Sequence, residues 1–173
     1  MFVYYFRVSG LNRKVAYYSI FAALAILMGY VESAIPMPVP IPGVKLGLSN
    51  IVVLLCMYVM GVKEGFYISI VRVIISALLF RGFVGLWYSM AGAVLSYAVM
   101  AFLIRFKSVS AIGISVAGGV AHNIGQIIVA VIILGRGVVI YLVPVLMISG
   151  VVTGIIIGII TKYCVYYVDK KEI

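Results

Sequence analysis

Residues 109–134 read VSAIGISVAGGVAHNIGQIIVAVIIL, a run of apolar and small side chains without a single Lys, Arg, Asp or Glu. A helix needs roughly 20 consecutive apolar residues to cross the hydrocarbon core of a bilayer, so this run is long enough to span a membrane. The whole chain has the same character. Of its 173 residues, 66% are apolar and 10% charged, whereas soluble domains carry about 25% charged residues. The sequence therefore predicts an all-α integral membrane protein.

Working outward from this run, six segments of the chain are predicted to be transmembrane helices. Their bounds are 15–35, 46–61, 65–80, 85–104, 109–134 and 138–163. The second and third are short and closely spaced, which predicts a tight helical hairpin that is tilted or shielded by its neighbours. The predicted organisation is a cytoplasmic N-terminal segment at residues 1–14, one membrane domain at 15–163 and a basic cytoplasmic tail at 164–173.

Prolines alternate through PMPVPIPG at residues 36–43, between the first two predicted helices. Proline has no backbone N–H and favours an extended, polyproline-like chain. Such backbone must lie outside the lipid core or over a protein cavity. We therefore expect a strap here.

The distribution of Lys and Arg predicts the orientation. With a cytoplasmic N-terminus, nine basic residues lie on the cytoplasmic side: Arg7, Arg13, Lys14, Lys63, Arg105, Lys107, Lys162, Lys170 and Lys171. Three lie outside: Lys45, Arg81 and Arg136. This excess predicts both termini in the cytoplasm and an extracytoplasmic strap. The net charge of +9 is thus explained by topology in a plasma membrane, and no nucleic-acid partner is expected.

The acidic residues exclude many enzyme classes, because the chain has only Glu32, Glu64, Asp169 and Glu172. Its single histidine has no neighbouring carboxylates or thiols and makes a poor metal site. The sequence contains no phosphate-binding loop of the G-x-x-x-x-G-K-[ST] type. We therefore expect no catalysis, no metal and no cofactor.

Polar residues within the predicted helices carry the functional information, since each is costly in lipid unless it is paired or faces water. The outstanding ones are Glu32, Arg72, His122, Asn123 and Gln126. His122 and Gln126 are four residues apart and share a helix face, which predicts a pocket wall or, alternatively, a hydrogen-bond network between helices. Glu32 and Arg72 could form a structural ion pair or contact a ligand.

The three outer basic residues Lys45, Arg81 and Arg136 either reach toward lipid headgroups or form a positive mouth over the pocket. A positive mouth would favour an anionic ligand with a carboxylate or phosphate. The aromatic residues Trp87, Tyr88 and Tyr141 are predicted at the same side, as interface anchors or as a stacking surface.

Small residues recur at helical spacing in two predicted helices. Ala22, Ala25, Gly29 and Ser33 form a stripe on the first, which would serve internal packing or a partner-binding face. Gly150, Gly154 and Gly158 recur every four residues in the last. This second ridge predicts packing within the chain.

The segment ESAIPMPVPIPGVKLGLSNIVVLL, with VRVIIS at residues 71–76, SMAGAVLSYAVM and SVAGGVAHNIGQIIVA, resembles a known family. The chain resembles the Gx transporter family over residues 15–162. That family is also catalogued as heptaprenyl diphosphate synthase component I, and its members are similar to the substrate-binding S components of energy-coupling factor (ECF) transporters. The strings PGVKLGLSN and AHNIGQ carry most of the likeness.

The resemblance implies a six-helix bundle that captures a vitamin-like or an isoprenoid- or quinone-related molecule from outside. It also implies partners, namely a transmembrane coupling subunit and two ATPases. The stripe of Ala22, Ala25 and Gly29 would meet the coupling subunit. Family motif positions give the candidate ligand-binding residues Lys45, Asn50, Arg72, His122, Asn123 and Gln126, to which Glu32 is added.

Two other functions remain open at this point. The synthase label would fit a non-catalytic membrane accessory of polyprenyl diphosphate or quinone synthesis. Prenyl elongation itself uses aspartate-rich motifs that hold magnesium diphosphates, and this chain has one aspartate. The resemblance also extends to membrane components of flavin-based extracellular electron transfer systems, although no residue here recognisably binds flavin.

Overall fold

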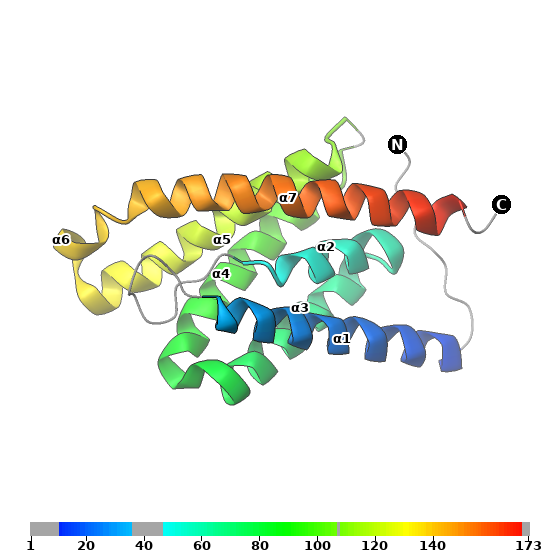
Figure 1. The fold of residues 1–173 in the computed structure, drawn as a ribbon, viewed down its shortest axis with the longest axis horizontal. Coiled ribbons are helices and arrows are strands. Elements are labelled where there is room, and N and C mark those ends of the chain that lie inside the picture. Colours follow the sequence, from blue (N-terminus) through cyan, green and yellow to red (C-terminus); the bar gives the residue numbers. More distant parts are fainter. Residues whose placement is uncertain (1–10, 36–46, 107, 171–173) are drawn as a thin grey trace.

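The computed structural model describes residues 11–35, 47–106 and 108–170, and all regular elements in these ranges are helices. They are α1 (Leu11–Ala34), α2 (Asn50–Val59), α3 (Val62–Ser76), the π-helix η1 (Ala77–Arg81), α4 (Gly82–Leu103), α5 (Ala111–Leu134), α6 (Arg136–Val139) and α7 (Val143–Lys170). The long helices are arranged as an elongated bundle (Figure 1). The predicted all-α architecture is confirmed for the described chain. The predicted proline-rich strap lies outside the described residues.

Within the described residues, four helices are long and apolar enough to cross a membrane: α1, α4, α5 and α7. The sequence predicted six. The second predicted segment, 46–61, contains only the ten residues of α2 in helical form, which at 1.5 Å per residue is about half the thickness of the hydrocarbon core. The third predicted segment corresponds to α3 and η1 together.

The predicted helix bounds differ from the observed ones where glycines and a proline intervene. Met60 and Gly61, the latter with φ of +134°, make the turn between α2 and α3, so the predicted spacer at 62–64 is part of α3. The last predicted helix begins later than expected, at Val143, because residues 136–142 form α6 and a turn. Pro144 occupies the first turn of α7, where a missing N–H costs nothing.

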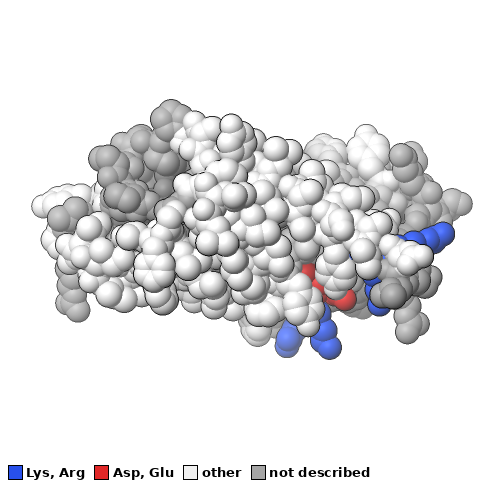
Figure 2. All heavy atoms as spheres, turned by 90° about the horizontal axis from the view of Figure 1, so that it is seen from below, with Lys and Arg blue, Asp and Glu red and all other residues white. Residues whose placement is uncertain are grey.

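The beginning of α1 and the end of α7 lie at the same end of the bundle, whereas α6 lies at the other (Figure 1). On the face that Figure 2 shows, the visible Lys and Arg side chains gather toward the end where α1 begins, and most of the remaining surface is uncharged. Charged groups are therefore scarce along the middle of this face. The surface resembles that of a protein whose middle is solvated by lipid.

α5 packs between α4 and α7 at backbone contact distance. A Cβ on Gly154 of α7 would lie 2.6 Å from Cα of Val116, and a Cβ on Gly125 of α5 would lie 2.5 Å from the carbonyl oxygen of Ala91. Gly150 and Gly158 make equally close approaches to α5. The glycine ridge of α7 therefore packs within the chain, as predicted.

The small-residue stripe of α1 faces into the bundle, with Ala25 and Gly29 buried and Ala22 and Ser33 partly exposed. Ala25 is completely buried in a cluster with residues of α2 such as Val52 and Cys56, and Ala22 packs against the same cluster. A Cβ on Gly29 would lie 2.7 Å from Oγ of Ser76 on α3. We therefore assign Ala22, Ala25 and Gly29 to internal packing, the alternative to a partner-binding face. The outward face of α1 carries larger apolar side chains: Val15, Ile20, Leu24, Leu27, Tyr30 and Val31.

Candidate functional site

The turn that precedes α2 places polar backbone inside the bundle. Gly47 has φ of +78°, a conformation that glycine adopts without steric cost. The N–H of Asn50 donates to the carbonyl of Gly47 over 2.9 Å, which closes the turn and starts the helix. In Figure 1, α2 begins near the middle of the bundle's length. The N-terminus of α2, the positive end of its dipole, is therefore surrounded by other helices.

Glu32, from the last turn of α1, places its carboxylate against this turn. The N–H of Gly47 donates to Oε1 over 2.5 Å, and the Ser49 hydroxyl donates to Oε2 over 3.1 Å. The side chain of Glu32 is 3% exposed. Both carboxylate oxygens thus have a donor in the same short turn, which offsets part of the cost of burial.

Arg72, on α3, approaches the same turn from the opposite side. Its Nη1 donates to the Ser49 hydroxyl, and its Nη2 donates to Oδ1 of Asn50 over 3.3 Å. The side chain is 4% exposed. Since a hydroxyl can accept one hydrogen bond while it donates another, Ser49 connects the guanidinium of Arg72 to the carboxylate of Glu32. The structure thus brings the two charged residues into one network.

Asn50 extends this network to α4. Its Nδ2 donates to the hydroxyl of Ser96 over 3.2 Å, and Ser96 is almost completely buried. The amide of Asn50 therefore uses its oxygen toward α3 and its nitrogen toward α4. This double role fixes the N-terminus of α2 between those two helices.

His122, on α5, lies against the same turn, and Gln126 lies beside it on the same helix. Their Nε2 atoms are 3.1 Å apart, as expected for residues one helical turn apart on the same face. A Cβ on Gly47 would lie 3.2 Å from Cδ2 of the imidazole, and a Cβ on Gly92 would lie 2.7 Å from its Cε1. The ring is therefore held between two glycines, one before α2 and one on α4.

Asn123 is next to His122 in the chain but faces α7. Its Nδ2 donates to the carbonyl of Leu146 over 2.5 Å and lies 3.3 Å from the hydroxyl of Ser149. The structure thus separates Asn123 from His122 and Gln126, which share the other face of α5. These hydrogen bonds connect α5 to α7.

Of the predicted outer residues, Lys45 lies outside the described residues, as do the side chains of Arg81 and Arg136. Trp87 and Tyr141 are exposed, consistent with the predicted interface anchors. Tyr88 is 1% exposed and packs with Ala130, Val139 and Leu146, so it is not an interface anchor, the first of the two roles predicted for it.

Four residues of the site were not singled out from the sequence. They are Gly47, Ser49, Gly92 and Ser96. Their signal was present, because all four fall within PGVKLGLSN and SMAGAVLSYAVM, two of the segments that resemble the family. We name the assembled set the polar cluster: Glu32, Gly47, Ser49, Asn50, Arg72, Gly92, Ser96, His122 and Gln126.

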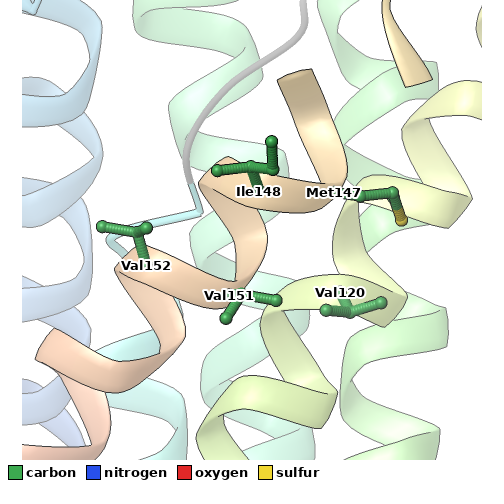
Figure 3. Close-up of a pocket in the computed structure, with 5 residues that line it drawn as sticks. All are labelled: Val120, Met147, Ile148, Val151 and Val152. Atoms are coloured by element: carbon green, nitrogen blue, oxygen red, sulfur yellow. The ribbon is translucent and has the colours of Figure 1, made fainter. Parts of the chain in front are cut away.

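A separate hollow of about 360 Å³ lies between α5 and α7 (Figure 3). It is lined by apolar side chains, those of Val120, Met147, Ile148, Val151 and Val152. It has no lining residue in common with the polar cluster. Within the described ranges, no three His, Cys, Asp or Glu side chains come together in a way that could hold a metal ion.

Comparison with known proteins places these features in a family. The family model of heptaprenyl diphosphate synthase component I matches residues 21–164, a range that includes every member of the polar cluster. No curated protein and no solved structure matches the chain. On the extent of the family match, this chain belongs to the heptaprenyl diphosphate synthase component I family.

Proposed function

We propose that this protein is a membrane-embedded substrate-binding subunit, similar to the S component of an ECF transporter, that captures a small anionic molecule from outside the cell. The observation that carries the proposal is the polar cluster itself. It collects two charged side chains, an imidazole and two amides from four helices, α1, α2, α3 and α5, inside an otherwise apolar bundle. Buried polar groups are costly in a membrane protein and most often mark the path or site of a substrate.

The polar cluster is the proposed ligand site. Glu32, Asn50, Arg72, His122 and Gln126 converge on the N-terminus of α2, and the start of a helix is favourable for an anionic group. The proposal extends the site to Lys45, which precedes the turn in the chain, and to Asn123, which would support it by bonding α5 to α7. The ligand would be vitamin-like or related to isoprenoids and quinones, as the family likeness suggests.

The proposed topology has six crossings with both termini in the cytoplasm. α1, α4, α5 and α7 supply four of them. α2 and the residues before it would supply another, and α3 with η1 the sixth. The gathering of visible basic residues at one end supports this orientation, because cytoplasmic loops of membrane proteins carry an excess of Lys and Arg.

The proposed partners are a transmembrane coupling subunit and two ATPases. Since the small-residue stripe of α1 faces into the bundle, we propose that such a partner meets the outward face of α1, which includes Ile20, Leu24 and Leu27. These side chains are apolar, so they can contact lipid or another membrane helix equally well.

A second candidate is favoured by the name of the family. The protein would then be a non-catalytic membrane accessory of polyprenyl diphosphate or quinone synthesis. Membership of a flavin-based extracellular electron transfer system is a variant of this alternative. In either case the polar cluster would bind a membrane-soluble product or a partner protein.

Native mass spectrometry of the tagged protein, gently extracted from its own membranes, would separate these functions. We expect coupling subunits and ATPases in the complex, together with a retained small molecule of acidic character. The retained molecule should be lost from the His122→Ala and Gln126→Ala variants and kept by Ser108→Ala, a change at an exposed residue between α4 and α5. A prenyltransferase or a redox protein without any ATPase would instead support the accessory function.

A further inference from the structure

The carboxylate of Glu32 is held as a bound carboxylate ligand would be. One oxygen receives the N–H of Gly47 and the other receives the hydroxyl of Ser49, which in turn accepts from Arg72. We name the three donor groups the carboxylate cradle: the N–H of Gly47, the hydroxyl of Ser49 and the guanidinium of Arg72. The cradle combines a helix N-terminus with a buried cation, the usual elements of an anion site.

The cradle is fixed by contacts that do not involve Glu32. Arg72 is also bonded to Asn50, and Asn50 is bonded to Ser96 on α4. Gly47 is closed into its turn by the N–H of Asn50. The donor groups therefore belong to the turn before α2 and to α3, with Asn50 linking them to α4, while the carboxylate comes from α1. A change in the position of α1 would remove the acceptor and leave the donors in place.

The contact between α1 and α3 supports a movement of α1 away from the donor groups. Ser76 lies one turn after Arg72 on the same face of α3, is 2% exposed, and its hydroxyl has no hydrogen-bond partner among the described residues. It lies against Gly29 of α1, which offers no side chain. A buried hydroxyl without a partner is costly, and it provides an additional group beside the cradle for an incoming ligand.

Glu32 lies close to the end of its helix. α1 ends at Ala34, and Ala34 and Ile35 are already exposed. Unwinding of this last turn would carry the carboxylate out of the bundle without disturbing the buried part of the helix. Helix ends fray more readily than helix centres, since their final carbonyl groups lack partners within the helix.

We propose that the carboxylate cradle is a ligand subsite for a carboxylic acid group, and that Glu32 occupies it in this structure as a tethered substitute. The ligand's acid group replaces Glu32, whose release accompanies binding. The proposal rests on the proposed function and adds the chemical class of the ligand, a monocarboxylate. This class follows from the donors of the cradle. The cradle provides one described cation, Arg72, and hydrogen-bond donors for the two oxygens of a planar carboxylate.

Chemical rescue tests the cradle without knowledge of the natural ligand. Glu32→Ala removes the tethered carboxylate, and free formate or acetate should then occupy its place. We expect the apparent Tm of purified Glu32→Ala to rise saturably, by about 3 °C or more, between zero and 100 mM acetate. Glu64→Ala, a change at the only other described glutamate, should show no more response than the unchanged protein.

A comparison of acetate and formate with chloride and inorganic phosphate distinguishes carboxylate binding from general screening of charge. Equal stabilisation by chloride at the same ionic strength would overturn the proposal, and so would stabilisation by inorganic phosphate but not by formate or acetate. If Glu32→Ala cannot be extracted as a folded protein, acetate present during extraction should restore a monodisperse peak in size-exclusion chromatography. Failure of this restoration, when Glu32→Gln is folded, would also overturn the proposal.

The test of the cradle and the test of the proposed function can fail independently. Rescue of Glu32→Ala by acetate would support the cradle even if native mass spectrometry found no transporter subunits. Conversely, an ATPase complex with a retained small molecule would support the transporter function even if Glu32→Ala showed no response to carboxylates.

Discussion

Gly92 on α4 and His122 on α5 are in such close contact that no side chain fits between them. A Cβ on Gly92 would lie 2.7 Å from Cε1 and 2.8 Å from Nδ1 of the imidazole, and 3.0 Å from the carbonyl oxygen of His122. The position of the ring is therefore determined by the absence of a side chain on the neighbouring helix.

The first prediction concerns this contact. Gly92→Ala should displace the imidazole from Gln126 and weaken ligand retention in native mass spectrometry at least tenfold, with a stability loss of about 1–3 kcal/mol from overpacking. Gly137→Ala is the matched control, because no atom lies within 4 Å of a Cβ there. Unchanged retention by Gly92→Ala would show that the ring position is not needed for binding.

The second prediction concerns the hydroxyl that connects Glu32 with Arg72. Ser49→Ala should lower the free energy of unfolding by about 1–3 kcal/mol, since both charged groups lose a buried hydrogen bond. Thermal unfolding in detergent measures the effect. Ser19→Ala removes an exposed hydroxyl that bonds only its own helix backbone in the structure, and it should change the Tm by less than about 1 °C. Equal effects of the two changes would contradict the proposed role of Ser49.

The third prediction separates charge from geometry at Arg72. Arg72→Ala should be strongly destabilising, by about 3–5 kcal/mol, because it leaves the carboxylate of Glu32 buried beside a missing cation. Arg72→Lys keeps the charge but cannot contact Ser49 and Asn50 through two nitrogens. We expect this variant to fold and to lose ligand retention. Arg105→Lys, at an exposed position, is the control and should retain ligand normally.

The fourth prediction tests the assignment of the α1 stripe to internal packing. Gly29→Leu should destabilise the protein, since its Cβ would lie 2.7 Å from Oγ of Ser76. Ala23→Leu, at an exposed position of the same helix, should leave the Tm unchanged. Normal stability of Gly29→Leu, combined with loss of partner proteins from the native complex, would instead restore the interpretation of the stripe as a partner-binding face.

The membrane class and the candidate polar residues were predictable from the sequence because each depends on a short range of chain. Apolar length and the scarcity of charge predicted helices for α1, α4, α5 and α7, and Glu32, Arg72, His122 and Gln126 were recognised by their cost in lipid. The segment was predicted to be short, but the start of α2 at Asn50 was missed, because Leu46 and Leu48 continue the apolar run toward the N-terminus. The positive φ of Gly47, which keeps the residues before Asn50 out of the helix, is not visible in hydropathy.

The sequence by itself determined that the protein is helical and apolar, which residues share a face of one helix, and which polar groups need a partner. Only the tertiary structure decided which groups these polar side chains bond to. It placed Ser49 between Glu32 and Arg72, directed Asn123 to α7, and turned the stripe of α1 into the bundle. The physical reason is that helix periodicity fixes directions within one helix. Which faces of two helices pack together depends on how closely the helices can approach at glycines. It also depends on which of the few available hydrogen-bond partners each buried polar group obtains.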